Sequence, residues 1–231
     1  MRMQQSGRCG ICDLRLPDGA ACPNYWCRRA DRAFDVVWAV GEHTGGLRRA
    51  VAAAKYRADD RRAVLLGQLL GRYLLDRAPC FDDIELIVAT PGSRRSSGHV
   101  PRLLEVAASL VGDLWEIDVV SAAGPVLAKR GDSRPLATSP TGAVRRLRAA
   151  GELRPTLTVE RPERVLGRRV LAVDDVFTDG STLREVARAL RLAGAVGVSG
   201  LVLARQPLAA RRARPADRAA GAMLGAGHLG W

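Results

Sequence analysis

Short runs of apolar residues alternate with amphipathic segments along most of the chain. The apolar runs have the length and β-branched content of buried strands, and the segments between them place apolar residues three and four positions apart, as helices do. We predict strands at residues 36–41, 85–89, 115–120, 170–173 and 196–204. Helices are predicted at residues 47–56, 61–75, 103–111 and 183–192.

This alternation of strands and helices predicts an α/β fold. Helical crossovers between strands produce a parallel sheet with helices on both faces. In such a sheet, ligands bind at the carboxyl ends of the strands. Residues that directly follow a predicted strand are therefore the first candidates for a functional site.

Three segments fall outside this pattern. Residues 1–33 hold four of the five cysteines and are predicted to form a small segment in front of a domain at 34–205. Residues 128–158 are rich in Arg, Pro, Gly, Ser and Thr, and they are predicted to be a long functional or mobile loop. Residues 206–231 have the composition of a disordered tail, with docking of their last apolar residues on the domain as the alternative.

The cysteines of the first segment have the spacing C-x2-C-x9-C-x4-C. Two close pairs of thiolates can converge on one Zn²⁺ and order a segment that is too small to bury a core. Disulfides are the alternative, although they are unusual in a cytosolic chain. The sequence therefore predicts a structural zinc site formed by Cys9, Cys12, Cys22 and Cys27.

Composition adds a charge preference but does not identify a partner. The 231-residue chain has a net charge of +12, and nearly all of its basic residues are arginines. Such a chain favours polyanions, namely nucleic acid or phosphate esters, although codon bias explains scattered arginines equally well. The chain has neither a long apolar run nor a signal-peptide core, so we expect a cytoplasmic protein without a membrane partner.

The most informative stretch is residues 170–182, which read VLAVDDVFTDGST. Small and hydroxyl-bearing residues between a strand and a helix allow backbone amides to surround a phosphate at the positive end of the helix. Two carboxylates just before such a loop are expected to hold something other than the phosphate. The vicinal hydroxyls of a sugar fit, and so does hydrated Mg²⁺.

This stretch resembles the signature that type I phosphoribosyltransferases use to bind phosphoribosyl pyrophosphate (PRPP). Together with the cysteines and the stretch KYRADD at 55–60, the chain is similar to the ComF subgroup, which carries a zinc ribbon before a phosphoribosyltransferase-like domain. The resemblance implies a Rossmann-like type I phosphoribosyltransferase fold. It also implies transfer of phosphoribosyl from PRPP to a nitrogen acceptor with Mg²⁺.

The resemblance assigns expected roles to individual positions. Asp174 and Asp175 would contact the ribose hydroxyls, directly or through Mg²⁺, and are the expected catalytic residues. The 5′-phosphate would lie against Thr178, Asp179, Gly180, Ser181 and Thr182. The pyrophosphate loop would comprise Thr90, Pro91, Gly92 and Ser93, with Arg94 and Arg95 near the leaving group. Lys129 and Arg130 would open a flap over the site.

Two departures from the family pattern are visible. Asp179 replaces a hydroxyl residue in the phosphate loop, and RRSSG at 94–98 lacks the Arg-Gly-Phe-Asn pattern common in ComF proteins. For Lys55, Tyr56 and Arg57, a hood over the acceptor and a solvated helix face are both open. We expect His43 and His99 to be surface residues.

A second function remains open from the sequence alone. The protein could keep the PRPP fold without turnover and act in DNA uptake or processing, as the ComF resemblance suggests. Its partners would then be single-stranded DNA or a DNA-processing protein. The low aromatic content of 4% offers few surfaces on which bases could stack. A homodimer is also compatible with the sequence.

Overall fold

The computed structural model describes residues 7–57, 59–92, 98–118, 124–131 and 133–207. A five-stranded parallel sheet forms its centre, with strand order β1-β7-β6-β2-β3. The strands are β1 (Val37–Glu42), β2 (Leu86–Ala89), β3 (Glu116–Ile117), β6 (Arg169–Phe177) and β7 (Gly197–Arg205). The helices are α1 (Gly45–Arg57), α2 (Asp60–Asp76), α3 (His99–Val111), α4 (Gly142–Arg148) and α5 (Ser181–Leu192).

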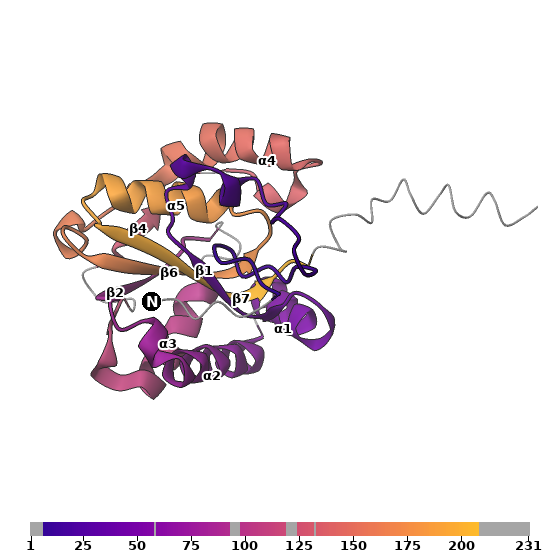
Figure 1. Cartoon of the computed structure of the whole chain (residues 1–231). Helices are drawn as coiled ribbons and strands as arrows, with labels where there is room; N and C mark the ends of the chain where they lie inside the picture. The colour runs from indigo at the N-terminus through magenta and orange to yellow at the C-terminus, as the bar shows by residue number, and fades with distance from the viewer. Residues whose placement is uncertain (1–6, 58, 93–97, 119–123, 132, 208–231) are drawn as a thin grey trace, which may run out of the picture.

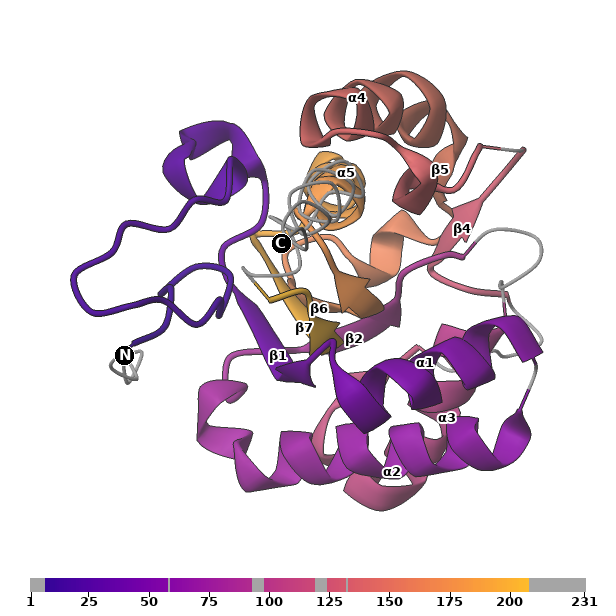
Figure 2. The same ribbon diagram turned by 90° about the vertical axis from the view of Figure 1, so that its right-hand side faces the viewer.

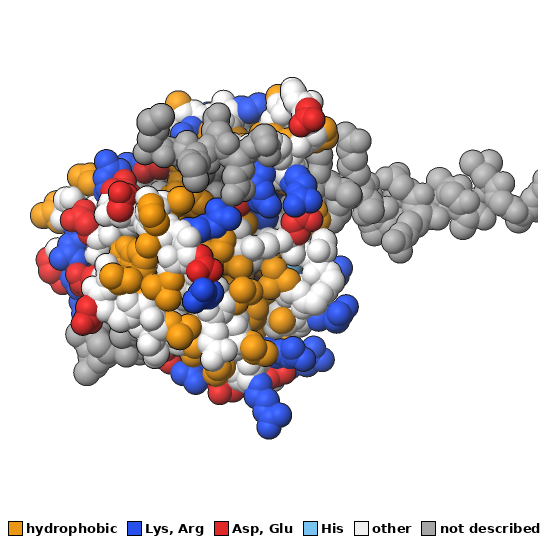
Figure 3. All heavy atoms as spheres, turned by 60° about the horizontal axis from the view of Figure 1, so that its bottom comes forward, with side chains coloured by type: hydrophobic (Ala, Val, Ile, Leu, Met, Phe, Trp, Pro, Cys, Tyr) orange, Lys and Arg blue, Asp and Glu red, His pale blue; other side chains and the backbone are white. Residues whose placement is uncertain are grey.

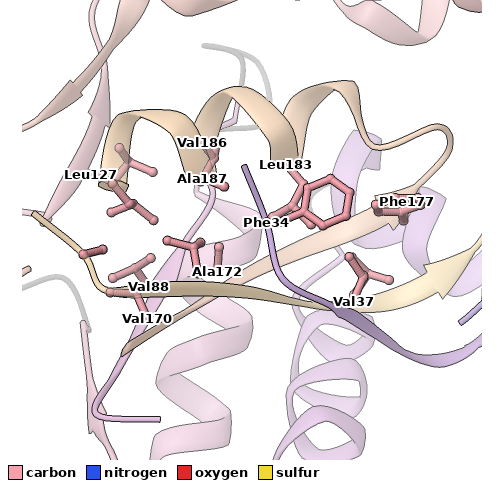
Figure 4. Packing of buried hydrophobic residues seen from close by; sticks show 14 of the residues in the cluster. Phe34, Val37, Val88, Leu127, Val170, Ala172, Phe177, Leu183, Val186 and Ala187 are labelled. Atoms are coloured by element: carbon pink, nitrogen blue, oxygen red, sulfur yellow. The ribbon is translucent and has the colours of Figure 1, made fainter. Parts of the chain in front are cut away.

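Helices cover both faces of the sheet, which confirms the predicted α/β class. Helices α1, α2 and α3 lie on one face, and α5 lies on the other with α4 beyond it (Figures 1 and 2). In β6 the pleat sends Leu171 and Val173 into the core beside α1–α3, whereas Val170 and Ala172 enter the core beneath α5. Figure 4 shows Val186 and Ala187 of α5 packed over this second layer.

The pair α2 and α3 packs closely because Gly67 and Gly71 of α2 lie against α3. A Cβ atom on Gly67 would lie 2.6 Å from the Cβ of Val106 and 2.8 Å from the carbonyl oxygen of Leu103. The outer side of this pair exposes Leu65, Leu69 and other apolar side chains between charged ones, and Figure 3 brings that side toward the viewer. Among the described residues, no helix is both long and apolar enough to span a membrane.

The cysteine-containing segment packs on the α5 side of the sheet. Its residues Cys9, Cys12, Leu14 and Trp26 belong to the same buried cluster as Val37 and Val170. The segment is therefore held by the hydrophobic core that also holds the sheet.

The prediction of a long loop at 128–158 is wrong for most of its length. The described part contains the antiparallel pair β4 (Leu127–Lys129) and β5 (Leu157–Val159), helix α4 and a wide helical turn at Ala149–Leu153. The turn buries Ala149 and Leu153, and Thr141 caps α4 by accepting a hydrogen bond from the Val144 amide. A few buried apolar residues and a cap thus order a segment whose composition resembles a loop.

Candidate active site

The two adjacent acids lie inside the central strand rather than after it. Strand β6 continues to Phe177 because β7 pairs with it as far as Arg205. Asp174 and Asp175 consequently occupy the carboxyl-terminal half of a strand that has neighbours on both sides. Their backbone positions are fixed, so the side chains are held at the carboxyl-terminal ends of the strands, where ligands of parallel sheets bind.

The two carboxylates differ in their surroundings. Asp174 accepts a hydrogen bond from the Asp175 amide at 2.9 Å, and burial followed by the charge of Asp175 raises the pKa of Asp174 to about 6. For Asp175, burial opposes ionisation, but hydrogen bonds from His99 and Lys55 and their charges outweigh it and lower the pKa. Asp175 is therefore the permanently ionised member of the pair.

Lys55 and His99 share one oxygen of Asp175. The Lys55 Nζ lies 2.6 Å from Asp175 Oδ2, and His99 Nε2 lies 2.8 Å from the same atom. Burial works against the charge of Lys55, yet the attraction of Asp175 prevails and raises the pKa of the lysine. Lys55 therefore does not lie on a solvated helix face, whereas Tyr56 and Arg57 are exposed.

The prediction that His99 is a surface residue is wrong. Its side chain is only 7% exposed, and it begins α3, the helix that follows β2. The signal lay in topology: β2 is the neighbour of β6, so a residue that starts the helix after β2 can reach the carboxyl edge of β6. Sequence distance from Asp175 conceals this proximity.

The loop between β6 and α5 has the geometry of an anion-binding turn. Gly180 has φ of 90°, and a Cβ atom there would lie 2.6 Å from the Phe177 ring, so only glycine fits. Helix α5 begins at the next residue, Ser181. The Ser181 hydroxyl is buried and has no hydrogen-bond partner in the described part of the chain. Such a donor beside a helix amino terminus suits a phosphate oxygen.

Asp179 turns its carboxylate inward at this loop. Its Oδ1 accepts a hydrogen bond from the Ser181 amide at 3.1 Å, and its Oδ2 lies 3.5 Å from Nη1 of Arg145 in α4. Asn24 of the cysteine segment donates to its carbonyl oxygen at 3.1 Å. The acid therefore engages one of the amides that a phosphate would use and attracts a cation that a phosphate would attract.

The remaining predicted positions are placed less completely. Thr90 is buried after β2, its amide donates to the Val173 carbonyl at 2.8 Å, and its side chain counteracts part of the rise in the pKa of Asp174. Strand β2, which neighbours β6, thus leads directly into the expected pyrophosphate loop. Pro91 and Gly92 follow Thr90, and Ser93, Arg94 and Arg95 lie outside the described residues.

Lys129 lies in β4, in the separate two-stranded sheet, and Arg130 pairs with Glu160 at 2.6 Å.

The four cysteines converge on one point. Their sulfur atoms all lie within 4.8 Å of one another, and the Sγ atoms of Cys12 and Cys22 are 3.8 Å apart. Zinc–sulfur bonds of about 2.3 Å in a tetrahedron place sulfur atoms roughly 3.8 Å apart. All five cysteines are free thiols, so the disulfide alternative is not what the structure shows. Hydrogen bonds from Cys22 and Cys27 lower the pKa of Cys12 to about 6.

Arg205, the last residue of β7, connects this cluster to the loop between β6 and α5. Its buried guanidinium donates to the Cys12 carbonyl at 3.1 Å and to Cys12 Sγ at 3.4 Å. It also donates to the carbonyl oxygens of Phe177 and Thr178 at 3.1 and 2.8 Å. The sequence analysis missed this residue, although an arginine that ends an apolar strand was a visible signal.

Comparisons with known proteins give distant similarities. No family model matches the chain, and no curated protein matches it significantly. An allosteric regulatory enzyme of purine biosynthesis is 21% identical with a TM-score of 0.37, over 61% of this chain and 25% of that one. The glutamine PRPP amidotransferase of B. subtilis, complexed with ADP and GMP, is 18% identical with a TM-score of 0.44, over 73% and 37%.

A phosphoribosyltransferase from Corynebacterium diphtheriae is also similar. It is 21% identical with a TM-score of 0.36, over 76% of this chain and 75% of that one. The chain thus spans less than two fifths of the purine biosynthesis enzyme and of the PRPP amidotransferase. These similarities are too distant to assign the chain to a family.

Proposed function

We propose that the chain binds PRPP at the β6–α5 junction and transfers its phosphoribosyl group to a nitrogen acceptor. The observation that carries this proposal is the short passage from two adjacent carboxylates on the central strand to a glycine turn and a helix amino terminus. One half of this passage suits sugar hydroxyls and the other a phosphate. The motif resemblance supports the same substrate.

Within this proposal the two acids have different tasks. Asp174 is the ligand of the ribose hydroxyls, since Asp175 Oδ2 is already engaged by Lys55 and His99. Asp175 positions those two groups at the edge of the sheet. Lys55, carried by α1, then contributes positive charge where a pyrophosphate would leave.

The donors also fit a magnesium ion. The half-buried carboxylate of Asp174, beside the ionised carboxylate of Asp175, offers the oxygen ligands that Mg²⁺ prefers. Asp174 would be its main protein ligand, and the ion would supply charge stabilisation to the departing pyrophosphate. The Thr90 side chain, which favours the ionised form of Asp174, would help to keep this ligand charged.

The 5′-phosphate would bind the amides and hydroxyls of 178–182. The buried Ser181 hydroxyl supplies a donor, and Gly180 provides the turn. Entry of a phosphate requires the Asp179 carboxylate to leave the Ser181 amide or to share it. Arg145 would then face the phosphate from α4, which gives the 128–158 segment a role at the site despite its ordered structure.

The metal of the cysteine cluster is proposed to be Zn²⁺ in a structural role. Four sulfur atoms at mutual distances suited to a tetrahedron form a closed site without an open position for chemistry. The cluster belongs to the hydrophobic core, so its metal would stabilise the α5 side of the sheet.

Titration calorimetry with PRPP and Mg²⁺ tests the proposal. Wild type should bind, and Asp174→Asn should bind about tenfold more weakly, because an amide accepts hydrogen bonds from hydroxyls less strongly than a carboxylate does. Pyrophosphate release with a panel of nitrogen bases then tests turnover. Absence of binding at millimolar PRPP would refute the proposed substrate. DNA retention that falls steeply with salt, without PRPP binding, would instead favour the DNA-processing alternative.

A further inference from the structure

A basic cavity lies between residues 30–35 and helix α5. It has a volume of about 380 Å³ and is lined by residues 30–35 together with Arg184, Arg188 and Arg191 of α5. Its lining carries four arginines and two aspartates, which leaves a net positive charge. None of the residues assigned to PRPP above lines it.

Two of its arginines are held in fixed positions by neighbours. Arg191 donates to the carbonyl of Ala33 and to Asp35, both at 2.6 Å. Arg184 stacks over the Trp26 ring at 4.8 Å and donates to the buried Glu185 at 2.6 Å. These two side chains form a rigid wall whose charges are largely balanced by acids.

The other two arginines supply the uncompensated charge. Within the described part of the chain, Arg32 and Arg188 form no ion pair with an acid, and Arg32 donates only to the Arg29 carbonyl at 3.0 Å. The Nε atoms of Arg32 and Arg184 are buried without a hydrogen-bond partner there. Buried guanidinium donors without acceptors are unfavourable unless an anion compensates them.

The backbone of the same cavity adds amide donors. Ala33 is a non-glycine residue with φ of 68°, directly after the helical residue Arg32. Successive residues in right-handed and left-handed helical conformations turn their amides toward one side and form a concave anion site called a nest. Arg191 holds the Ala33 carbonyl and so stabilises this strained conformation. The Phe34 amide donates to no acceptor in the described residues.

We propose that this cavity is a second anion site, specific for the diphosphate or polyphosphate group of a small molecule. Guanidinium groups and nest amides together match the several oxygens of such a group. The cavity volume suits a small ligand, and its aspartates Asp31 and Asp35 disfavour a long polyanion laid across it. The buried Phe34 offers no exposed ring for a base, so recognition rests on the phosphates.

Arginine modification with phenylglyoxal, mapped by mass spectrometry, tests this site residue by residue. Inorganic pyrophosphate and ADP should each slow modification of Arg188 several-fold. Protection by both probes assigns recognition to the phosphates, whereas protection by ADP alone would contradict the proposal. Arg72, exposed on α2 and paired with Asp76, is the control and should react equally with and without ligand.

Calorimetry on variants supplies the second measurement and separates this site from the PRPP site. Arg32→Gln combined with Arg188→Gln should lose one pyrophosphate site, or weaken it at least tenfold, and should keep PRPP binding; Arg72→Gln should change neither. If thermal unfolding shows that the double variant does not fold, the same binding measurement is made on Arg188→Gln alone. Unprotected Arg188, unchanged pyrophosphate binding in the variant, or protection only by an oligonucleotide would overturn the proposal.

Discussion

Replacing Asp179 with asparagine is the sharpest perturbation of the proposed phosphate loop. Asparagine has the same shape, and its side-chain oxygen can still accept the Ser181 amide that Asp179 Oδ1 accepts at 3.1 Å. The substitution removes only the negative charge. Arg145, now 3.5 Å from the Asp179 carboxylate, would lose its counter-charge and become available to a phosphate.

Loss of the Asp179 charge and release of Arg145 should both strengthen phosphate binding. A unit charge about 4 Å from another contributes roughly 1 kcal/mol of repulsion in a water-like dielectric and more in a drier site. A gain of about 1 kcal/mol corresponds to roughly fivefold tighter binding. Folding stability should move the other way, falling by about 1 kcal/mol, because the partly buried ion pair between Asp179 and Arg145 is lost.

Calorimetry with PRPP and Mg²⁺ would measure the affinity, and urea denaturation the stability. Asp113→Asn is the matched control, because it makes the same change of net charge at an exposed position after α3. The expected pattern is tighter binding and lower stability for Asp179→Asn alone. Equal or weaker PRPP binding by Asp179→Asn would show that its carboxylate does not oppose the phosphate, and the loop assignment would fail.

Four other outcomes test the remaining parts of the site. Elemental analysis should find about one zinc per chain, and stripping it with a chelator should lower the melting temperature. Lys55→Met should destabilise the fold by about 1–3 kcal/mol in urea denaturation, because Asp175 Oδ2 loses one of its two side-chain donors. Gly180→Ala should abolish PRPP binding through a clash with Phe177, whereas Gly46→Ala, where nothing lies within 4 Å, should not. Without Mg²⁺, wild-type stability should decline relative to Asp174→Asn as pH rises from about 4 to 6, because a carboxyl with a raised pKa binds its proton more tightly in the folded state.

The periodic elements of the fold were predictable because each carries its own signal. The strands at 85–89 and 196–204 and the helices at 61–75 and 183–192 are found within a few residues of their predicted bounds. The acids were predictable as a pair because they follow an apolar run and precede a glycine turn. Local chemistry was enough in both cases.

The partners of the acids were not predictable from local pattern. Lys55 and His99 reach Asp175 from helices that precede β2 and follow it, at separations of 120 and 76 residues. The prediction of a loop at 128–158 failed because it rested on local composition alone. Tertiary packing buries Ala149 and Leu153 and so orders this part of the segment. The basic cavity also depends on two distant segments, and only the fold brings 30–35 beside α5.

The hydrogen bonds from Arg205 to Cys12 can form only late in synthesis of the chain on the ribosome. The two residues are 193 positions apart, so the first described segment is synthesised long before its last anchor. At translation rates of about 5–20 residues per second, this interval is roughly 10–40 s. During that interval Leu14 and Trp26, which are buried in the finished protein, lack the later residues of their hydrophobic cluster, such as Val198 and Val202 of β7. A metal bound early by the cysteines would keep this waiting segment compact and shield it from aggregation or proteolysis.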